Sequence, residues 1–380
     1  MFLTIISVII VLGGLIFFHE LGHFIVARLF GMGVSTFSLG FGPKILKHKW
    51  GQTEYALSLV PLGGYVALVG ESDGADIPEG FTIHESFARR PAWQRLLVIA
   101  AGPLANILLA WLLFWAIAFV WGTPVMQPVI GAVAPDSPAF RAGIQAGDTI
   151  AAINGKEIKS WDEMSEAINA SAGEPMRILL MRPAQNDDAR NMPRNMPEDT
   201  RQNMRQDMGQ DLEVELRAEK SVRKTIFGED ETAWLIGVRA GNAIATEPQP
   251  FWQAAQAGAI QTWHMVALTW QSFVKLAQRI VPLDQVGGPI MIAQMVGEQA
   301  HHGLAGLLAL TALISVNLGI LNLLPVPVLD GGQILFCLYE MICGRPLPLK
   351  AQEYATRVGL ILLLGLMVLA TFNDIWRLIK

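Results

Sequence analysis

The sequence predicts a multi-pass α-helical membrane protein with four transmembrane helices and a single extramembrane domain of α+β type. Of its 380 residues, 52% are hydrophobic and only 16% are charged, a balance that is unusual for a soluble domain. The apolar residues gather in four stretches of the chain. Because a helix needs about 20 residues to cross the hydrocarbon core of a bilayer, these stretches are candidate spans.

The apolar stretches define the four predicted transmembrane helices. They are residues 1–28, 96–121, 303–329 and 358–373. The second and third contain no Asp, Glu, Lys or Arg, and the first contains none before Glu20. The fourth is shorter, but Arg357 and Asp374 flank it and are expected to reach the lipid headgroups.

Basic residues indicate how the helices are oriented. Between the first and second spans lie Arg28, Lys44, Lys47, Lys49, Arg89, Arg90 and Arg95. Loops rich in Lys and Arg remain in the cytoplasm, so this loop is predicted to be cytoplasmic and residues 122–300 to lie on the outer side. The net charge of −5 gives no reason to expect a nucleic-acid partner.

The extramembrane segment begins with short β-type runs separated by turn residues and continues with a helical pattern from Trp161. Residues 131–168 read GAVAPDSPAFRAGIQAGDTIAAINGKEIKSWDEMSEAI. The positions of SPA, AG, GD and ING in this stretch resemble a bacterial PDZ domain, for which we expect residues 122–225. PDZ domains bind peptides by adding a strand to a sheet edge.

The end of this domain carries a polar insertion. Residues 176–182 and 212–217 are predicted to be paired strands, whereas 184–211 contain near-repeats of RNMP and RQNM and no aromatic residue. This composition cannot build a core, so 184–211 are predicted to be a disordered insertion. Residues 226–302 are expected to form an amphipathic helical segment.

The first span contains the motif HELGH, which is typical of a zinc site. Residues four apart share a helix face, so His19 and His23 can bind one metal ion while Glu20 stands beside it. In such a site the histidines are ligands and the glutamate is the general base for a water whose pKa the zinc lowers to about 7. The sequence therefore predicts one Zn²⁺ with Glu20 as the catalytic base.

A hydrolytic zinc site needs a third protein ligand. Six residues after His23 stands Leu29, which excludes the third histidine of soluble metzincins, and Glu54 lies in a strand-like stretch rather than on a helix. The remaining carboxylate near a span is Asp330, where Pro325 precedes it and two glycines follow. Helices broken at membrane depth are tolerated only beside a cavity or within protein, so Asp330 is predicted to be the third ligand.

Three motifs together resemble the site-2 protease family, and its RseP-type intramembrane metalloproteases in particular. They are HELGH at 19–23, AGPLAN at 101–106 and NLGILNLLPVPVLDGG at 317–332. The resemblance implies that Asn317 and Asn322 contact the substrate, and that residues 55–70 form a membrane-associated β-hairpin on the cytoplasmic side. The membrane part is accordingly expected to have two segments. Residues 1–121 contain the first two transmembrane helices and the HExxH motif, and residues 303–380 contain the third and fourth helices and the motif NxxPxPxLDG.

The resemblance also implies an activity and a location. Members cut transmembrane segments of membrane-anchored proteins, such as anti-sigma factors or remnant signal peptides, so single-span membrane proteins in the cell inner membrane are the expected partners. RseP proteins of enteric-type bacteria carry two PDZ domains in tandem, whereas this sequence predicts one. Substrate selection is therefore expected to differ.

Two other functions are compatible with parts of the sequence. A membrane metal-ion transporter would also place histidines and an aspartate in spans, but residues 96–121 offer only Asn106 and a few weakly polar groups along a path. A catalytically inactive PDZ scaffold would have no use for Glu20, which a metal does not require as a ligand. Both observations favour the protease.

Overall fold

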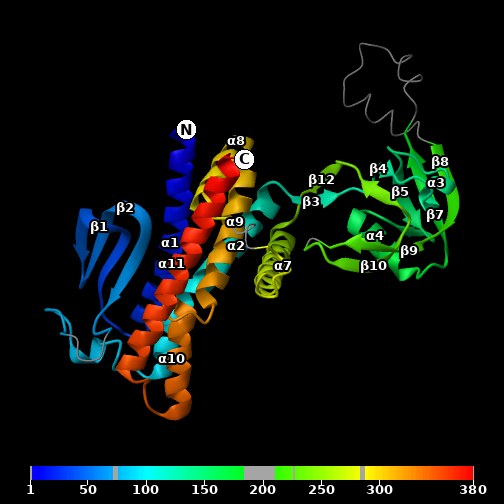
Figure 1. The fold of residues 1–380 in the computed structure, drawn as a ribbon. Coiled ribbons are helices and arrows are strands. Elements are labelled where there is room, and N and C mark those ends of the chain that lie inside the picture. The colour runs from blue at the N-terminus through cyan, green and yellow to red at the C-terminus, as the bar shows by residue number, and fades with distance from the viewer. Residues whose placement is uncertain (1, 72–75, 184–209, 226, 283–286, 380) are drawn as a thin grey trace, which may run out of the picture. The chain divides into compact units, whose positions relative to one another are not determined.

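The computed structural model describes residues 2–71, 76–183, 210–225, 227–282 and 287–379. They form two compact units (Figure 1). Unit 1 combines Met1–Trp121 with Gln249–Lys380, and unit 2 is Gly122–Pro248.

Unit 1 is a helical bundle with a small sheet. Four of its helices are long and apolar enough to cross a membrane, which agrees with the four predicted spans: α1 (Phe2–Leu29), α2 (Ala92–Val120), α9 (Leu304–Leu323) and α11 (Leu349–Ile379). The other helices among the described residues of this unit are η1 (Ile83–Glu85), α7 (Phe251–Ala277), α8 (Pro289–His302) and α10 (Asp330–Cys343).

The centre of the bundle lies where α1, α2, α8 and α9 meet. Leu15, Leu109, Val296 and Leu310 form one buried apolar cluster between these helices. Lipid tails are as apolar as leucine, so close backbone contact rather than hydrophobicity holds such helices together. Small residues are therefore expected at the tightest crossings.

Glycines occupy the crossings of α2 with its neighbours. A Cβ added to Gly22 of α1 would lie 2.3 Å from the Ala101 carbonyl oxygen, and one added to Gly319 of α9 would lie 2.9 Å from the Pro103 carbonyl oxygen. No side chain fits at the first distance without separating the helices. The backbone of α2 thus touches both neighbours directly.

Asp374 of α11 is buried rather than exposed to headgroups as the sequence analysis expected. Its side chain is 3% exposed. The carboxylate accepts hydrogen bonds from the backbone amides of Gly288, Ile290 and Met291 at 2.9–3.0 Å. These amides open α8, where no earlier carbonyl can satisfy them, so the need for a helix cap explains the burial.

The loop between α1 and α2 folds into a sheet in which residues 55–70 do not form the predicted hairpin, because residues 36–39 lie between the two halves of that segment. It consists of β1 (Val34–Trp50) and β2 (Thr53–Leu68). Residues 36–39 pair on one side with 64–67 and on the other with 54–57, while 44–50 pair with 53–58. The positive φ angles of Gly40 (88°) and Gly42 (87°) allow β1 to bend between its two halves.

Unit 2 is built around an antiparallel sheet in the order β6-β5-β7-β8. In chain order it contains β3 (Thr123–Met126), β4 (Ile130–Val133), α3 (Pro138–Arg141), β5 (Thr149–Ile153), β6 (Lys156–Glu157), α4 (Trp161–Ala170), β7 (Pro175–Arg182), β8 (Gln210–Arg217), β9 (Glu219–Lys224), β10 (Asp230–Leu235), β11 (Val238–Ala240) and β12 (Ile244–Glu247). The predicted pairing of 176–182 with 212–217 and the helix at Trp161 are confirmed.

Local sequence explains the elements of unit 2. Asn154 and Gly155 both have positive φ, as the tight turn of a hairpin requires, and they join β5 to β6. Ser160 caps α4 by accepting a hydrogen bond from the Glu163 amide at 3.1 Å. Alternate residues of β7, among them Ile178 and Leu180, are fully buried, as expected for a strand with one face on the core.

One ion pair closes the end of this sheet. The carboxylate of Asp148 is 1% exposed and accepts two hydrogen bonds from the Arg182 guanidinium, at 2.7 and 2.8 Å. These bonds raise the pKa of Arg182 above its already high value. The pair satisfies a carboxylate that burial alone would penalise.

Two expected boundaries differ from the structure. Unit 2 ends at Pro248 rather than at 225, and part of the segment expected to be helical, 226–302, forms β10, β11 and β12. The physical reason is pairing: β11 lies against β4 and β12 against β3. The predicted insertion 184–211 lies outside the described residues, apart from Gln210 and Asp211, which belong to β8.

The α1–α2 crossing generates a stability prediction. Gly22→Ala should lower the free energy of unfolding by about 1–3 kcal/mol, because its methyl group would overpack the helix interface. The measurement is the thermal unfolding midpoint of the purified protein in detergent. Gly14→Ala is the matched control, since nothing lies within 4 Å of a Cβ there; equal midpoints for both variants would contradict the proposed crossing.

Candidate metal centre

His19 and His23 stand one turn apart on α1 and face the same direction. Their Nε2 atoms lie 3.2 Å from each other, and both side chains are largely buried. The spacing of four residues in a continuous helix produces this geometry. The histidine pair predicted from HELGH is thus present as a pair.

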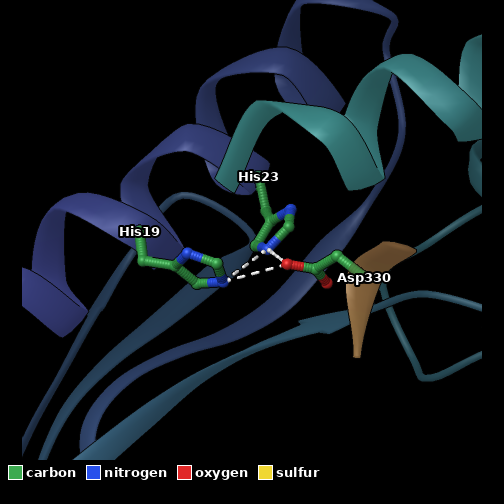
Figure 2. A group of neighbouring side chains, drawn as sticks. All are labelled: His19, His23 and Asp330. Atoms are coloured by element: carbon green, nitrogen blue, oxygen red, sulfur yellow. Dashed lines mark hydrogen bonds and ion pairs between the residues drawn. The ribbon is translucent and has the colours of Figure 1, made fainter. Parts of the chain in front are cut away.

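Asp330 reaches the histidines from the other end of the chain (Figure 2). Helix α9 ends at Leu323, two residues before Pro325, and α10 begins at Asp330 itself. The Asp330 Oδ2 atom lies 3.2 Å from His19 Nε2 and 3.7 Å from His23 Nε2. The structure therefore brings together the three side chains that the sequence analysis selected as metal ligands.

The three atoms fit a tetrahedral zinc ion. Zinc bonds of about 2.0–2.1 Å place neighbouring ligand atoms about 3.3 Å apart, close to the three separations seen here. Asp330 Oδ2 is buried and has no hydrogen-bond partner among the described residues. Three atoms that carry lone pairs thus converge, an arrangement that a bound cation stabilises. Two imidazoles and a carboxylate are a donor set that zinc accepts.

Glu20 stands next to this group but not within it. The residue is half-buried, and the metal-binding group consists of His19, His23 and Asp330 alone. The backbone of Val66 in β2 hydrogen-bonds its carboxylate, and a Cβ on Gly64 would lie 3.3 Å from Glu20 Cγ. The second half of β2 therefore passes directly beside the carboxylate.

Helix α2 provides the wall behind the two histidines. A Cβ on Gly102 would lie 2.3 Å from His23 Nε2 and 2.9 Å from His19 Cε1. Only a glycine leaves room for both rings at this position. The Nδ1 atom of His23 lies 2.8 Å from the Val98 carbonyl oxygen, which turns its Nε2 atom toward Asp330.

The two asparagines predicted to contact substrate lie apart on α9. Five residues of helix separate Asn317 from Asn322, so their side chains project about 140° apart. The Oδ1 atom of Asn317 accepts a hydrogen bond from Thr269 of α7 at 2.7 Å. Asn322 is half-buried, and its side chain makes no hydrogen bond within the described part of the chain.

The sequence analysis missed Asn106. This residue of α2 is fully buried, and its Nδ2 atom lies 3.2 Å from His19 Nδ1. The available signal was a lone amide side chain in an apolar span, within the motif AGPLAN. The motif also places Asn106 four residues after Gly102, and therefore on a face of α2 where a small residue permits close contact with another helix.

Comparison with known proteins identifies the family of this chain. The model of peptidase family M50 matches residues 7–366 of the chain. The chain belongs to this family, the site-2 proteases. As a site-2 protease it is a multi-pass membrane protein and a metallopeptidase.

Several relatives of this site-2 protease match along nearly their whole length. A protein of Agrobacterium fabrum, named as a candidate zinc metalloprotease, is 35% identical over 394 residues, which cover 100% of this chain and 97% of the relative. The Yersinia pestis protein named protease RseP is 33% identical, with 97% of this chain and 98% of the relative covered. The Geobacillus kaustophilus protein named zinc metalloprotease RasP is 30% identical, with coverages of 98% and 98%.

An ion pair ties α10, and hence Asp330, to α2. Arg95 of α2 donates a hydrogen bond to the carboxylate of Glu340, and both side chains are largely buried. Glu340 lies in the helix that Asp330 opens. The pair therefore holds the C-terminal part of α10, the helix that Asp330 opens, against α2.

Exchanging these charges tests that role. Arg95→Met should destabilise the protease by about 1.5–3 kcal/mol, the range for hydrogen bonds to charged groups. The double variant Arg95→Glu with Glu340→Arg should recover part of the loss, because it restores an opposite pair. Thermal unfolding and cleavage rate are measured for the double variant and for Arg95→Glu and Glu340→Arg alone. A double variant less stable than both of these single variants would refute a direct pair.

Proposed function

We propose that this site-2 protease is an intramembrane zinc endopeptidase that cuts transmembrane segments of membrane-anchored proteins. The observation that carries the proposal is the convergence of His19 and His23, on the candidate span α1, with Asp330 at 3.2–3.7 Å and Glu20 beside them. Relatives named zinc metalloproteases support the choice of metal. His19, His23 and Asp330 would be its three ligands.

The proposed chemistry assigns a separate role to Glu20. A zinc ion held by His19, His23 and Asp330 would supply a Lewis acid that polarises the scissile carbonyl and lowers the pKa of water. Glu20 takes the proton from the attacking water and then delivers it to the leaving amine, as a carboxylate general base and acid does. Its position next to the ligand group, rather than in it, is what this role requires.

The sheet beside Glu20 answers a second requirement of cleavage in a membrane. A substrate helix must unwind before its peptide bond is accessible, and each amide released in the bilayer costs several kcal/mol unless it finds a partner. Residues 64–68 pair with β1 on one side, and no described strand covers their other side. We propose that the unwound substrate adds to this free edge beside Glu20.

Asn317 and Asn322 are proposed to bind other parts of the substrate backbone. Their amides can donate and accept hydrogen bonds where the unwound segment has no helix partners. Asn317 would have to exchange its bond with Thr269 for one with the substrate, whereas Asn322 has no described side-chain partner to give up. The two side chains point in different directions, so they would contact different substrate residues.

The location and partners follow from the basic loop and from the family. We propose an inner-membrane enzyme whose site lies toward the cytoplasmic side, since the loop with Lys44, Lys47 and Lys49 adjoins it. Single-span proteins such as anti-sigma factors or remnant signal peptides are the proposed substrates. The choice of these substrates is supported by the family relationship rather than by any residue of this chain.

Unit 2 is proposed to be a single PDZ domain on the outer side. Its support is the turn punctuation of residues 131–155 and a four-stranded antiparallel sheet whose edge strands, β6 and β8, pair with no further strand among the described residues. The alignment with the Yersinia pestis relative spans 445 positions, more than the 380 residues of this chain. The additional residues of the Yersinia pestis relative are compatible with one PDZ domain in this chain and more than one in the relative.

Metal content and activity of four variants test the zinc site. His19→Ala, His23→Ala and Asp330→Ala should each lose zinc, whereas Glu20→Gln should keep zinc and lose cleavage, because a base is not a ligand. Zinc is quantified in the purified proteins and cleavage is followed with a model transmembrane substrate. A metal-free Glu20→Gln, or a loaded and active Asp330→Ala, would rule out the assignment.

A second experiment tests unit 2 as a size filter. Since Asp330 and the histidines all belong to unit 1, unit 2 can select substrates but cannot perform the chemistry. Removing residues 123–247 should preserve cleavage of a span with a short outer stub and permit cleavage of one with a folded outer domain, as expected when specificity comes from exclusion. Equal cleavage of both substrates by the intact enzyme would contradict the filter.

A further inference from the structure

The buried amide of Asn106 lies against the back of the candidate ligand His19. Asn106 is 0% exposed, and its Nδ2 atom lies 3.2 Å from the Nδ1 atom of His19, on the side of the ring opposite to the metal-binding Nε2. Its other amide atom, Oδ1, is buried without a hydrogen-bond partner among the described residues. A polar amide atom buried in this way costs free energy unless it is hydrogen-bonded.

The chemistry of histidine ligation determines which amide atom faces the ring. An imidazole that binds a metal through Nε2 carries its proton on Nδ1, so Nδ1 must donate. An amide nitrogen cannot accept that proton. The oxygen and nitrogen of an asparagine amide have the same shape, and their assignment follows from the hydrogen-bond network. With zinc on His19, the Asn106 oxygen must face Nδ1.

We infer that Asn106 is a positioning residue of the zinc centre, whose amide oxygen accepts the Nδ1 proton of His19 and so holds its Nε2 atom available to the metal. This inference rests on the proposed function. It gives each histidine a partner from α2, since the Val98 carbonyl oxygen faces His23 Nδ1 at 2.8 Å.

The surroundings of Asn106 keep the amide at a fixed depth. Its backbone carbonyl oxygen accepts a hydrogen bond from Ser315 of α9 at 2.7 Å. On the same side, a Cβ on Gly319 would lie 3.5 Å from the Asn106 Cβ. Asn106 is thus packed between α9 and α1, and its amide has little freedom to move away from the His19 imidazole.

Substitutions at 106 separate an acceptor from a donor. Aspartate has the shape of asparagine and can only accept when ionised, so Asn106→Asp keeps the inferred bond and removes the opposite one. Leucine fills similar space and can do neither. Asn373→Leu makes the same exchange at another buried asparagine, in α11, and serves as the matched control.

The experiment measures zinc affinity of the purified full-length protein in detergent, by competition with a chelator, alongside cleavage. Asn106→Leu should weaken zinc binding about 10–100-fold, the usual effect of losing the group behind a ligating histidine. Asn106→Asp and Asn373→Leu should bind zinc as tightly as the wild type. Recovery of affinity by Asp but not Leu is a readout that a packing role alone would not produce.

Different results would overturn different claims. Wild-type zinc affinity in Asn106→Leu, or weakened affinity in Asn106→Asp, would overturn the inference and leave the zinc site intact. If Asn106→Leu does not fold, the Asp variant alone still decides which amide atom faces His19. Wild-type affinity in His19→Ala would instead overturn the proposed function itself.

Discussion

The close approach of α1 and α2 is the constraint on which the rest of the site depends. Gly22 and Gly102 remove the side chains that would separate these helices, and Gly102 also leaves room for the rings of both histidines. The helices run in opposite directions here, so His23 meets Val98 and His19 meets Asn106. One tight crossing thus supplies both the ligand pair and the groups behind it, which a looser, side-chain-filled interface could not do.

The position of Asp330, the third candidate ligand, depends on the break between α9 and α10 rather than on a helix crossing. A continuous α9 would carry Asp330 several turns beyond the histidines, because helical residues rise 1.5 Å each. Pro325 ends that helix, and α10 starts at Asp330, where the carboxylate is the first residue of a new helix. The break is tightly packed, because Cβ atoms added to Gly331 and Gly332 would lie 2.3–2.4 Å from the carbonyl oxygens of Leu323, Leu324 and Val326. The break that ends α9 therefore also places the third candidate ligand beside the two histidines.

The sequence predicted what is periodic or chemically rare, and it missed what depends on tertiary contact. Four apolar spans and the pair His19 and His23 follow from helical periodicity, and Asp330 stood out as a carboxylate beside prolines. Asn106 was missed although it lies four residues after Gly102, on the face of α2 where a small residue permits close contact with α1. Asp374 was expected at the headgroups because sequence does not show that α8 begins beside it. The strands β10 to β12 were missed because short edge pairings leave little periodic signal.

The free edge of β2 shows how the same physics can join structure and activity. An uncovered strand edge is normally a liability, since its amides and carbonyls invite pairing with other chains. In a membrane the liability is greater, because water is scarce there. An unwound substrate has the same unmet need, and the edge at residues 64–68 lies beside Glu20. The strand edge and the unwound substrate would satisfy each other's backbone hydrogen bonds beside Glu20. A substrate helix that remains wound would neither pair with the edge nor present a peptide bond to Glu20.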